Sequence, residues 1–280
     1  MSEIAPGIYL HRGLHEETSA ENLGAIANVG FVVGDAAVAV IDSGGSARQG
    51  QALLEAMRQV TDLPVKFVVN THVHPDHVFG NAAFVEEGAS FVGHAKLPRA
   101  LAARGAYYLE RLEQELGAAA EGSAVIAPGL TVSDRLDLDL GGRILTLTAH
   151  PTAHTDNDLT VLDQRTGTFW TGDLLFVERV PVIDGSLKGW LAVLDSLRAL
   201  EPGLVVPGHG PPTPDWRDAL APQERYFRTL LAEIRGILQA GGTMEQAVAG
   251  VGQEEKAEWR LFEDYHPRNV VTAFTELEWE

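Results

Sequence analysis

Four side chains that commonly bind transition metals fall within six residues of this chain. They are His72, His74, Asp76 and His77, in an H-x-H-x-D-H pattern. Imidazole nitrogens together with a carboxylate oxygen suit zinc, and iron and manganese accept the same ligands. A lone histidine is usually packed or solvated, but four ligands at this spacing predict a metal site.

The element before this cluster fixes its position. The apolar run at residues 65–70 predicts a buried strand, so the cluster begins where a strand ends. Ligands in α/β sheets bind at the C-terminal ends of strands. Three further metal-binding side chains follow predicted strands in the same way, and we expect them to join the site: His154, Asp173 and His209.

The composition is that of an ordinary globular protein, and it excludes several kinds of site and partner. The chain has 280 residues, of which 45% are hydrophobic, and can bury a substantial core. It contains no cysteine, which excludes disulfides, thiolate ligands and a cysteine nucleophile. The formal net charge of −18 repels phosphate backbones and anionic lipids. We therefore expect a small-molecule substrate, and neither a nucleic acid nor a membrane as partner.

The sequence shows neither a membrane span nor a signal peptide. No apolar run approaches the roughly 18 residues that a span needs. Residues 1–7 lack a basic n-region and an apolar h-region. As the sequence stands, a cytoplasmic location is expected, and a periplasmic one if a leader was removed.

The hydrophobic pattern divides the chain into two parts. Strands are predicted at residues 7–12, 29–34, 37–42, 65–70, 90–92, 124–126, 131–138, 143–149, 158–163, 168–171 and 204–207, and helices at 47–60, 97–116 and 186–200. After them only helices are predicted, at residues 215–239, 243–250, 254–263 and 267–278, with Asp215 and Thr243 as N-caps. We predict a catalytic α/β domain over residues 1–214 and a C-terminal helical extension, residues 215–280, packed on it. A separate helical domain is the alternative.

Taken together, the motifs resemble those of metallo-β-lactamase-fold hydrolases. The matching segments are THVHPDH at 71–77, HTDND at 154–158, TGD at 171–173 and PGHG at 207–210, in the family's order, and VIDSG at 40–44 resembles its early strand and turn. The resemblance covers about the first three quarters of the chain. It implies an αββα sandwich that carries its metals along one edge of the two sheets.

The same resemblance implies a role for each ligand. His72, His74 and His154 would bind one metal, Asp76, His77 and His209 a second, and Asp173 would bridge the two. Two zinc ions would share a hydroxide that attacks the substrate. Asp76 would orient this nucleophile and carry its proton.

Other residues carry weaker patterns. Asp42 is expected to support a ligand or a loop amide, with an ordinary turn cap as the alternative. We expect packed or hydrogen-bonded side chains at His94 and His150, and no metal ligand at His11, His15 or His266. The sequence favours core positions over a pocket wall for Phe79, Phe84, Phe176 and Trp190. Lys188 could hold a substrate carboxylate, although a surface lysine is the favoured interpretation.

Two groups within the fold offer closer comparisons. A bridging Asp173 is unlike zinc β-lactamases and resembles glyoxalase II, but the tail residues do not match that enzyme's glutathione-binding pattern: Arg225, Tyr226, Arg228, Arg235, Tyr265 and Arg268. Residues 21–28, 79–84 and 268–280 instead resemble the quinoprotein relay system zinc metallohydrolases. This resemblance implies a functional link to a quinoprotein dehydrogenase system.

We therefore expect a dinuclear zinc hydrolase that cleaves a small ester, thioester, lactone or lactam. Two alternatives stay open. One is a mononuclear iron enzyme of the persulfide dioxygenase type, which shares the fold and much of the ligand set. The other is a metal-binding relay protein without turnover.

Overall fold

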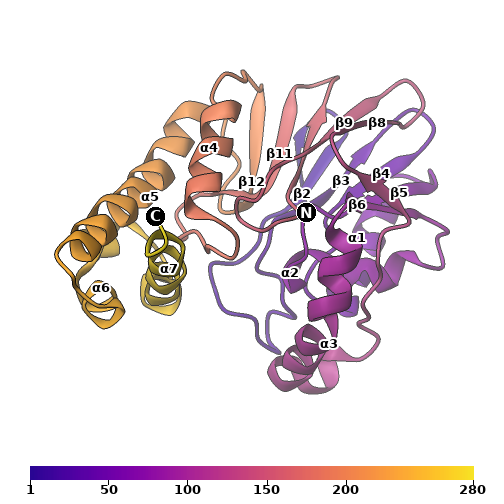
Figure 1. The fold of residues 1–280 in the computed structure, drawn as a ribbon. Coiled ribbons are helices and arrows are strands. Elements are labelled where there is room, and N and C mark those ends of the chain that lie inside the picture. The colour runs from indigo at the N-terminus through magenta and orange to yellow at the C-terminus, as the bar shows by residue number, and fades with distance from the viewer.

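Two β-sheets lie face to face between two layers of helices (Figure 1), in the computed structural model of residues 1–280. The first sheet has its strands in chain order: β1 (Ser2–Ala5), β2 (Ile8–His11), β3 (Val29–Val33), β4 (Val38–Ile41), β5 (Val65–Val69), β6 (Ser90–His94) and β7 (Leu130–Val132). Strands β1 to β4 pair antiparallel, and β4 to β7 pair parallel. The parallel half carries the strand that ends at the predicted metal cluster.

The second sheet has the order β12-β11-β10-β9-β8. Its strands are β8 (Arg135–Asp139), β9 (Ile144–Ala149), β10 (Leu159–Asp163), β11 (Thr168–Phe176) and β12 (Leu204–His209). Strands β11 and β12 pair parallel, and all other neighbouring strands of this sheet pair antiparallel. Side chains of both sheets, including Val32, Leu147 and Trp170, form one buried cluster, so the inner core lies between the sheets.

The helices cover the two outer faces (Figure 1). On the first sheet lie α1 (Ala47–Arg58), α2 (Pro75–Val78) and α3 (Leu97–Leu116), with 3₁₀ turns at Phe79–Phe84 and Gly117–Ala120. On the second lie α4 (Leu187–Leu197), α5 (Trp216–Gln239), α6 (Met244–Gly250), a 3₁₀ turn (Gln253–Glu258) and α7 (Phe262–Leu277). The predicted αββα sandwich with a C-terminal helical region is confirmed.

The C-terminal helices share a hydrophobic core with the second sheet. One cluster of 28 buried residues joins Phe169 and Val205 of the sheet to Trp190 of α4, Phe227 of α5 and Val270 of α7. Burial of this many apolar side chains couples the helices firmly to the sandwich. None of the helices combines the length and the apolar character that crossing a bilayer requires.

Several predicted boundaries were wrong. Residues 124–126 form no strand, and β1 was not predicted. The strand expected at 131–138 is two strands in different sheets, β7 and β8, because the chain turns at residues 133–134. Strand β11 continues beyond residue 171 to Phe176. In the tail, residues 253–258 form a 3₁₀ turn, and α7 begins before Pro267.

The two predicted N-caps behave differently. The Thr243 hydroxyl accepts a hydrogen bond from the Gln246 amide, and the Gln246 side chain accepts one from the Thr243 amide, which completes a capping box. Asp215 occupies the N-cap position of α5, but its side chain makes no capping hydrogen bond. Helix α5 therefore depends on its buried face rather than on its cap.

Candidate metal centre

The H-x-H-x-D-H segment occupies the loop and the single helical turn that follow β5. His72 and His74 lie in the loop, and Asp76 and His77 lie on α2, which begins at Pro75. Proline suits this first helical position, because it has no amide hydrogen to leave unpaired. The turn aims Asp76 and His77 toward the second sheet while the loop aims the two preceding histidines there.

The other three predicted ligands come from the second sheet. His154 lies in the loop between β9 and β10, Asp173 lies within β11, and His209 ends β12. Asp173 does not follow its strand as expected, because β11 continues past it with an irregular register at Gly172. A Cβ at Gly208 would lie 1.9 Å from Asp173 Oδ1, so the residue before His209 must be glycine for the carboxylate to fit.

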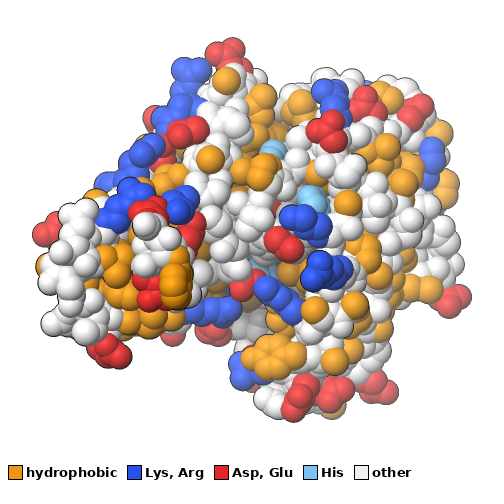
Figure 2. Space-filling model, viewed as in Figure 1, with side chains coloured by type: hydrophobic (Ala, Val, Ile, Leu, Met, Phe, Trp, Pro, Cys, Tyr) orange, Lys and Arg blue, Asp and Glu red, His pale blue; other side chains and the backbone are white.

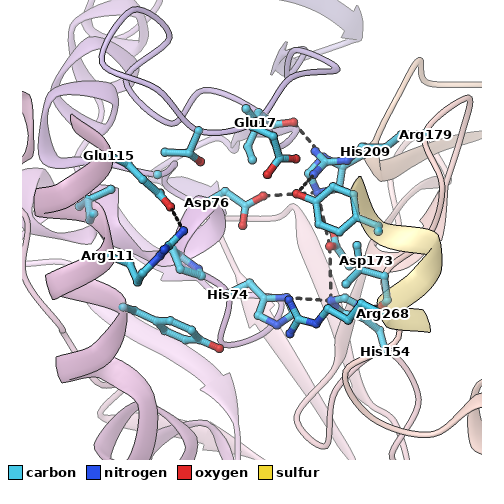
Figure 3. Close-up of a pocket in the computed structure, with 18 of the residues that line it drawn as sticks. Glu17, His74, Asp76, Arg111, Glu115, His154, Asp173, Arg179, His209 and Arg268 are labelled. Carbon is cyan, nitrogen blue, oxygen red and sulfur yellow. Dashed lines mark hydrogen bonds and ion pairs between the residues drawn. The ribbon is translucent and has the colours of Figure 1, made fainter. Parts of the chain in front are cut away.

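The structure brings all seven predicted ligands together in two groups (Figure 3). In the first group, His74 Nδ1 lies 3.1 Å from His72 Nε2 and 2.9 Å from His154 Nε2. Asp173 Oδ2 completes this group at 3.4 Å from His154 Nε2. Three nitrogens and one carboxylate oxygen thus converge on one point.

The second group consists of Asp76, His77 and His209. Asp76 Oδ2 lies 3.6 Å from His77 Nε2 and 3.4 Å from His209 Nε2. Asp173 again lies between, with Oδ1 3.1 Å from His77 Nε2 and Oδ2 3.4 Å from His209 Nε2. One carboxylate is therefore shared by both groups.

The outer nitrogen of each histidine faces an oxygen acceptor. The five contacts, between 2.7 and 3.1 Å, are His72 Nδ1 to Thr71 Oγ1, His74 Nε2 to Asp184 Oδ2, His77 Nδ1 to Asp42 Oδ2, His154 Nδ1 to the Val182 carbonyl and His209 Nδ1 to the Ile26 carbonyl. Thr71 Oγ1 donates its own hydrogen to Asp42, so it can accept from His72. Each outer nitrogen thus carries a proton. In a neutral imidazole the inner nitrogen is then unprotonated and has a free lone pair.

These inner atoms fit metal ions. Lone pairs that face one another at about 3 Å repel, and a cation between them removes the repulsion. The inner Nε2 of His77 and Oδ1 of Asp173 are also buried and have no hydrogen-bond partner. Buried polar atoms normally have partners, so these two are explained by ions that they would bind. Histidine with carboxylate is a ligand set that zinc, iron and manganese accept.

Asp42 supports both the segment and one ligand. Its Oδ1 accepts the Thr71 amide at 2.8 Å, and its Oδ2 accepts both the Thr71 hydroxyl and His77 Nδ1. Its backbone has a φ of +53°, a left-handed conformation that aspartate tolerates better than most residues. This is the predicted supporting role rather than that of a simple turn cap.

The pKa values of His72, His154 and Asp173 are shifted in the direction that favours cation binding. Burial lowers the pKa of His154 to about 3, and burial together with His77 lowers that of His72 well below its usual value. Burial alone would raise the pKa of Asp173, but the imidazoles of His209, His77 and His72 lower it further than burial raises it. At neutral pH two imidazoles are therefore neutral and the shared carboxylate is ionised.

His77 differs from these two imidazoles. Burial lowers its pKa, but the carboxylates of Asp173, Asp76 and Asp42 raise it well above the usual value. Cation binding at the second group would therefore compete with protonation of His77.

The comparison with known protein families agrees with this geometry. A family model described as the metallo-beta-lactamase superfamily matches residues 24–209. The match covers more than half of the chain and includes every residue of both ligand groups. The chain belongs to the metallo-beta-lactamase superfamily.

Individual relatives come from several branches of this superfamily. The chain is 28% identical over 232 residues to the linear primary-alkylsulfatase of Pseudomonas sp. (strain ATCC 19151), covering 70% of this chain and 43% of that protein. Its fold is similar to that of the stereoselective inverting sec-alkylsulfatase Pisa1 from Pseudomonas sp., with a TM-score of 0.75 and 18% identity over 98% of this chain and 49% of that chain. A metallo-beta-lactamase family protein from Thermus thermophilus gives a TM-score of 0.65 and 22% identity over 84% of each chain. This chain spans less than half the length of the alkylsulfatases that it matches.

The metal centre of this superfamily member lies at the base of a cavity of about 470 Å³ (Figure 3). Part of the lining comes from two helices, whose cavity residues we call the outer wall: Tyr107, Tyr108, Arg111, Leu112 and Glu115 of α3, and Tyr265 and Arg268 of α7. In the close-up, Arg111 and Glu115 lie across the cavity from Arg268. The sequence did not predict that any of these residues would form a cavity wall.

Two more residues near the centre were missed. Asp184 accepts from His74 and from Arg104 of α3, and its other oxygen lies 3.8 Å from Arg268 of α7. It thereby connects a metal ligand to helices on both sides of the cavity. Arg179 lines the cavity beside His209. Neither follows a strand in a recognisable motif, so no sequence signal marked them.

The remaining histidines belong to neither ligand group. His94 Nδ1 accepts the Lys96 amide, and His150 Nε2 lies 2.8 Å from Thr160 Oγ1. His266 lies between the Tyr226 hydroxyl and the Val251 carbonyl. His11 and His15 also belong to neither ligand group, although His15 Nε2 lies 3.3 Å from Glu178 close to the cavity.

The aromatic and lysine candidates also have clear positions. Phe79, Phe84 and Trp190 are fully buried in core clusters, as expected. Phe176 is buried too, but it stacks on His209 and lines the cavity. Lys188 is outside the cavity, where its Nζ donates to Glu280 at 2.8 Å. The favoured interpretation of Lys188 as a surface lysine is therefore confirmed.

Proposed function

We propose that this chain is a dinuclear zinc hydrolase that cleaves a small ester, thioester, lactone or lactam. The observation that carries the proposal is the sharing of Asp173, which lies within 3.4 Å of His154 in one group and 3.1 Å of His77 in the other. A carboxylate between two cations offsets their mutual repulsion. Ligand groups rich in imidazole, and without thiolate, are typical of catalytic zinc.

A pair of divalent cations bound here would supply an acidified water molecule as nucleophile and would polarise the scissile bond. The residues of the chain would position that water and receive its proton. Both carboxylates of the centre line the cavity, and Asp76 is the more exposed, with its side chain 15% exposed against 4% for Asp173. Burial raises the pKa of Asp76, but His77 and His209 lower it further, so its carboxylate is ionised at neutral pH. We assign to Asp76 the orientation of the attacking water and the acceptance of its proton.

The size of the cavity supports a small-molecule substrate. A volume of about 470 Å³ lies within the range of ordinary ligand sites and above the two ligand groups. Tyrosine rings and Phe176 provide apolar contact area, and arginines provide polar contacts. Such a pocket holds a compact molecule with its reactive bond over the centre.

Metal content, measured by elemental analysis on protein purified without added metal, is the first test. We expect close to two zinc ions per chain, followed by hydrolysis of thioesters, lactones, lactams or esters that disappears in Asp173→Ala. About one iron per chain with oxygen consumption would favour the persulfide dioxygenase alternative. Two zinc ions with no turnover above that of the metal-free protein on any panel member would favour the relay protein.

A second candidate function is hydrolysis of a sulfate ester. It is favoured by the 28% identity to an alkylsulfatase and by a fold likeness to another that covers 98% of this chain, C-terminal helices included. The same panel should therefore include a primary alkyl sulfate and a secondary one. Release of sulfate by wild-type protein, absent in Asp173→Ala, would support this candidate over carbonyl substrates.

A further inference from the structure

Arg179 is a buried cation for which the protein provides little compensation. It follows β11, is 3% exposed and lines the cavity next to the metal centre. Its Nη2 donates to the Tyr265 hydroxyl at 3.0 Å, and its guanidinium carbon lies 5.1 Å from the centre of the Tyr265 ring. Its Nε is buried and has no hydrogen-bond partner.

The remaining contact of Arg179 is not a hydrogen bond. Its Nη1 lies 3.0 Å from His209 Nδ1, but that nitrogen is also 2.8 Å from the Ile26 carbonyl. A carbonyl can only accept, so the Nδ1 proton points at Ile26 and no lone pair is left for the arginine. Only one of the three guanidinium nitrogens, Nη2, therefore donates a hydrogen bond within the protein.

No carboxylate neutralises this charge. The salt bridges of the chain include none to Arg179, although other arginines near the cavity have acidic partners, as Arg111 has Glu115 and Arg104 has Asp184. The adjacent Glu178 instead faces Arg12, His15 and Arg260, at 3.6, 3.3 and 4.0 Å. Glu17 lines the same cavity but lies more than 4.0 Å from the guanidinium. A buried unpaired charge costs several kcal/mol, so its place in the fold needs a reason.

With two divalent cations bound, the surroundings of Arg179 would attract anions. The cavity is lined by three arginines and four carboxylates, the latter being Glu17, Asp76, Glu115 and Asp173, so four positive charges from the cations would make its total charge positive. Figure 2 shows further basic side chains around the hollow in the centre of this face, in a protein whose net charge is −18. Positive charge concentrated in a cleft of an acidic protein selects for an anionic ligand.

We infer that Arg179 binds an oxyanion of the substrate, a sulfate or carboxylate group, and thereby restricts the proposed hydrolase to anionic substrates. This inference rests on the proposed function, since it concerns the substrate of the same centre. The guanidinium has unpaired N–H groups at Nε and Nη1, and Nη2 keeps a second hydrogen beside the one that it donates to Tyr265. Nη2 together with either neighbouring nitrogen forms a fork that matches two oxygens of one anion. Oxygen atoms of a bound anion would accept hydrogen bonds from the N–H groups that have no partner in the protein.

The binding test uses zinc-loaded protein and titration calorimetry with inorganic sulfate and with acetate, at constant ionic strength. We expect Arg179→Gln to weaken the preferred anion by about tenfold or more, because charge-assisted bidentate bonds are strong. The matched control is Arg135→Gln, which removes the same charge from an exposed position on β8 and should bind as wild type does. Equal binding by Arg179→Gln and wild type, or an equal loss in both variants, would overturn the inference.

A second readout separates anion binding from support of His209. Zinc content should stay at the wild-type level in Arg179→Gln, and loss of zinc would make Arg179 a positioning residue of the metal centre instead. If Arg179→Gln does not fold, Arg179→Lys decides, because lysine keeps the charge but not the fork. Weaker anion binding with zinc retained would then support the inference, and unchanged binding would refute it.

Hydrolysis of a matched ester pair connects the binding site to the substrate. The anion 4-acetoxybenzoate and its neutral methyl ester carry the same acetyl ester bond. Arg179→Gln should raise KM for the anion about tenfold and leave kcat/KM for the neutral ester within about twofold. A wild-type protein that cleaves neither this pair nor an alkyl sulfate would contradict the proposed function, while the sulfate titration would still decide the role of Arg179.

Discussion

The metal centre and the outer wall of the cavity are built in opposite ways. At the centre, His72, His77, His154 and His209 are nearly fully buried. At the outer wall, the side chains of Arg111 and Arg268 are more than half exposed, and Tyr107 is 61% exposed. The centre lies inside the packed sandwich, whereas the wall consists largely of exposed side chains on the solvent-facing parts of two helices that are themselves packed on it.

Hydrogen bonding shows the same contrast. Each histidine of the centre has an outer oxygen partner that fixes its ring and its tautomer. The wall has contacts such as Arg111 with Glu115, a pair one helical turn apart that is worth only tenths of a kcal/mol. We therefore expect the centre to determine whether the protein has activity, and the wall to influence which substrates bind.

Replacement of the shared carboxylate should have the largest effect. Asp173→Ala removes a ligand from both groups and leaves two cations without the charge between them. We expect both metals to bind far more weakly and hydrolysis to fall by at least about 10³-fold, or about 4 kcal/mol in activation free energy. Elemental analysis and kcat/KM on the same preparation measure both losses. Full activity in Asp173→Ala would rule out the dinuclear centre.

Asp42→Asn should weaken the second ligand group, which it contacts directly through His77, more than the first, which it reaches through Thr71 and His72. Asparagine tolerates the left-handed backbone at this position, but it places an NH₂ group where Asp42 accepts from His77 or Thr71. Loss of such an outer partner typically costs 10–100-fold in metal affinity, about 1.4–2.7 kcal/mol.

Zinc competition with a chromophoric chelator should show the second site weakened more than the first. Asp35→Asn is the control, since Asp35 pairs with Arg165 at the surface. Equal weakening of both sites would mean that Asp42 supports the loop as a whole rather than one ligand.

His150→Gln compares a buried histidine that binds no metal with those of the centre. Burial lowers the pKa of His150 to about 4, so the folded protein binds fewer protons there than the unfolded chain does. The stability that the neutral ring contributes is present above its ordinary pKa near 6.5 and is lost as the pH falls toward 4. Between pH 7.5 and 5 this amounts to about 2 kcal/mol.

Denaturant unfolding of metal-free wild type and His150→Gln at the two pH values isolates this contribution. Glutamine cannot titrate, so the variant should lose about 2 kcal/mol less than wild type on acidification. Parallel losses in the two proteins would show that His150 has the same pKa in the folded and unfolded states. Histidines that do not interact with residue 150 titrate in both proteins and cancel in the difference, whereas His94 interacts with it and contributes to the difference.

The contrast between centre and wall also explains why some residues of the site could be predicted from the sequence and others could not. The convergence of seven candidate ligands was predicted because each lies near a strand whose apolar residues mark it, and strand ends of the two sheets meet at one edge. The wall could not be predicted. Tyr108, Arg111 and Glu115 have the spacing of a solvated helix face, and only the packing of distant helices makes them line a cavity. Arg179 follows Glu178 and looks like half of a surface ion pair until the structure shows them facing apart.

The split of residues 131–138 has a similar cause. Alternating polar and apolar residues predict strand conformation, but they do not say which sheet a strand joins. The turn at residues 133–134 sends β7 to the first sheet and β8 to the second. Local pattern therefore gave the conformation, and only long-range pairing gave the topology.

Arg111→Gln tests the wall directly. It removes a half-exposed charge that already has a partner in Glu115, so little binding energy depends on it. We expect KM for an anionic ester to rise by about twofold to threefold, with kcat and zinc content unchanged. A loss as large as that of Arg179→Gln would mean that the wall, and not the buried arginine, provides the anion site.

Lys188→Ala should have the smallest effect and completes the comparison of cations inside and outside the cavity. Lys188 begins α4 and donates to Glu280, which also pairs with Arg235, so it ties the C-terminus to the helices rather than facing substrate. An exposed pair of this kind is worth at most about 1 kcal/mol. Thermal unfolding should shift by only a few degrees, and kcat/KM for 4-acetoxybenzoate should stay within about twofold. Because Lys188 and Arg179 carry the same charge, a selective effect of Arg179 alone would show that burial beside the metal centre, and not net charge, determines which substrates bind.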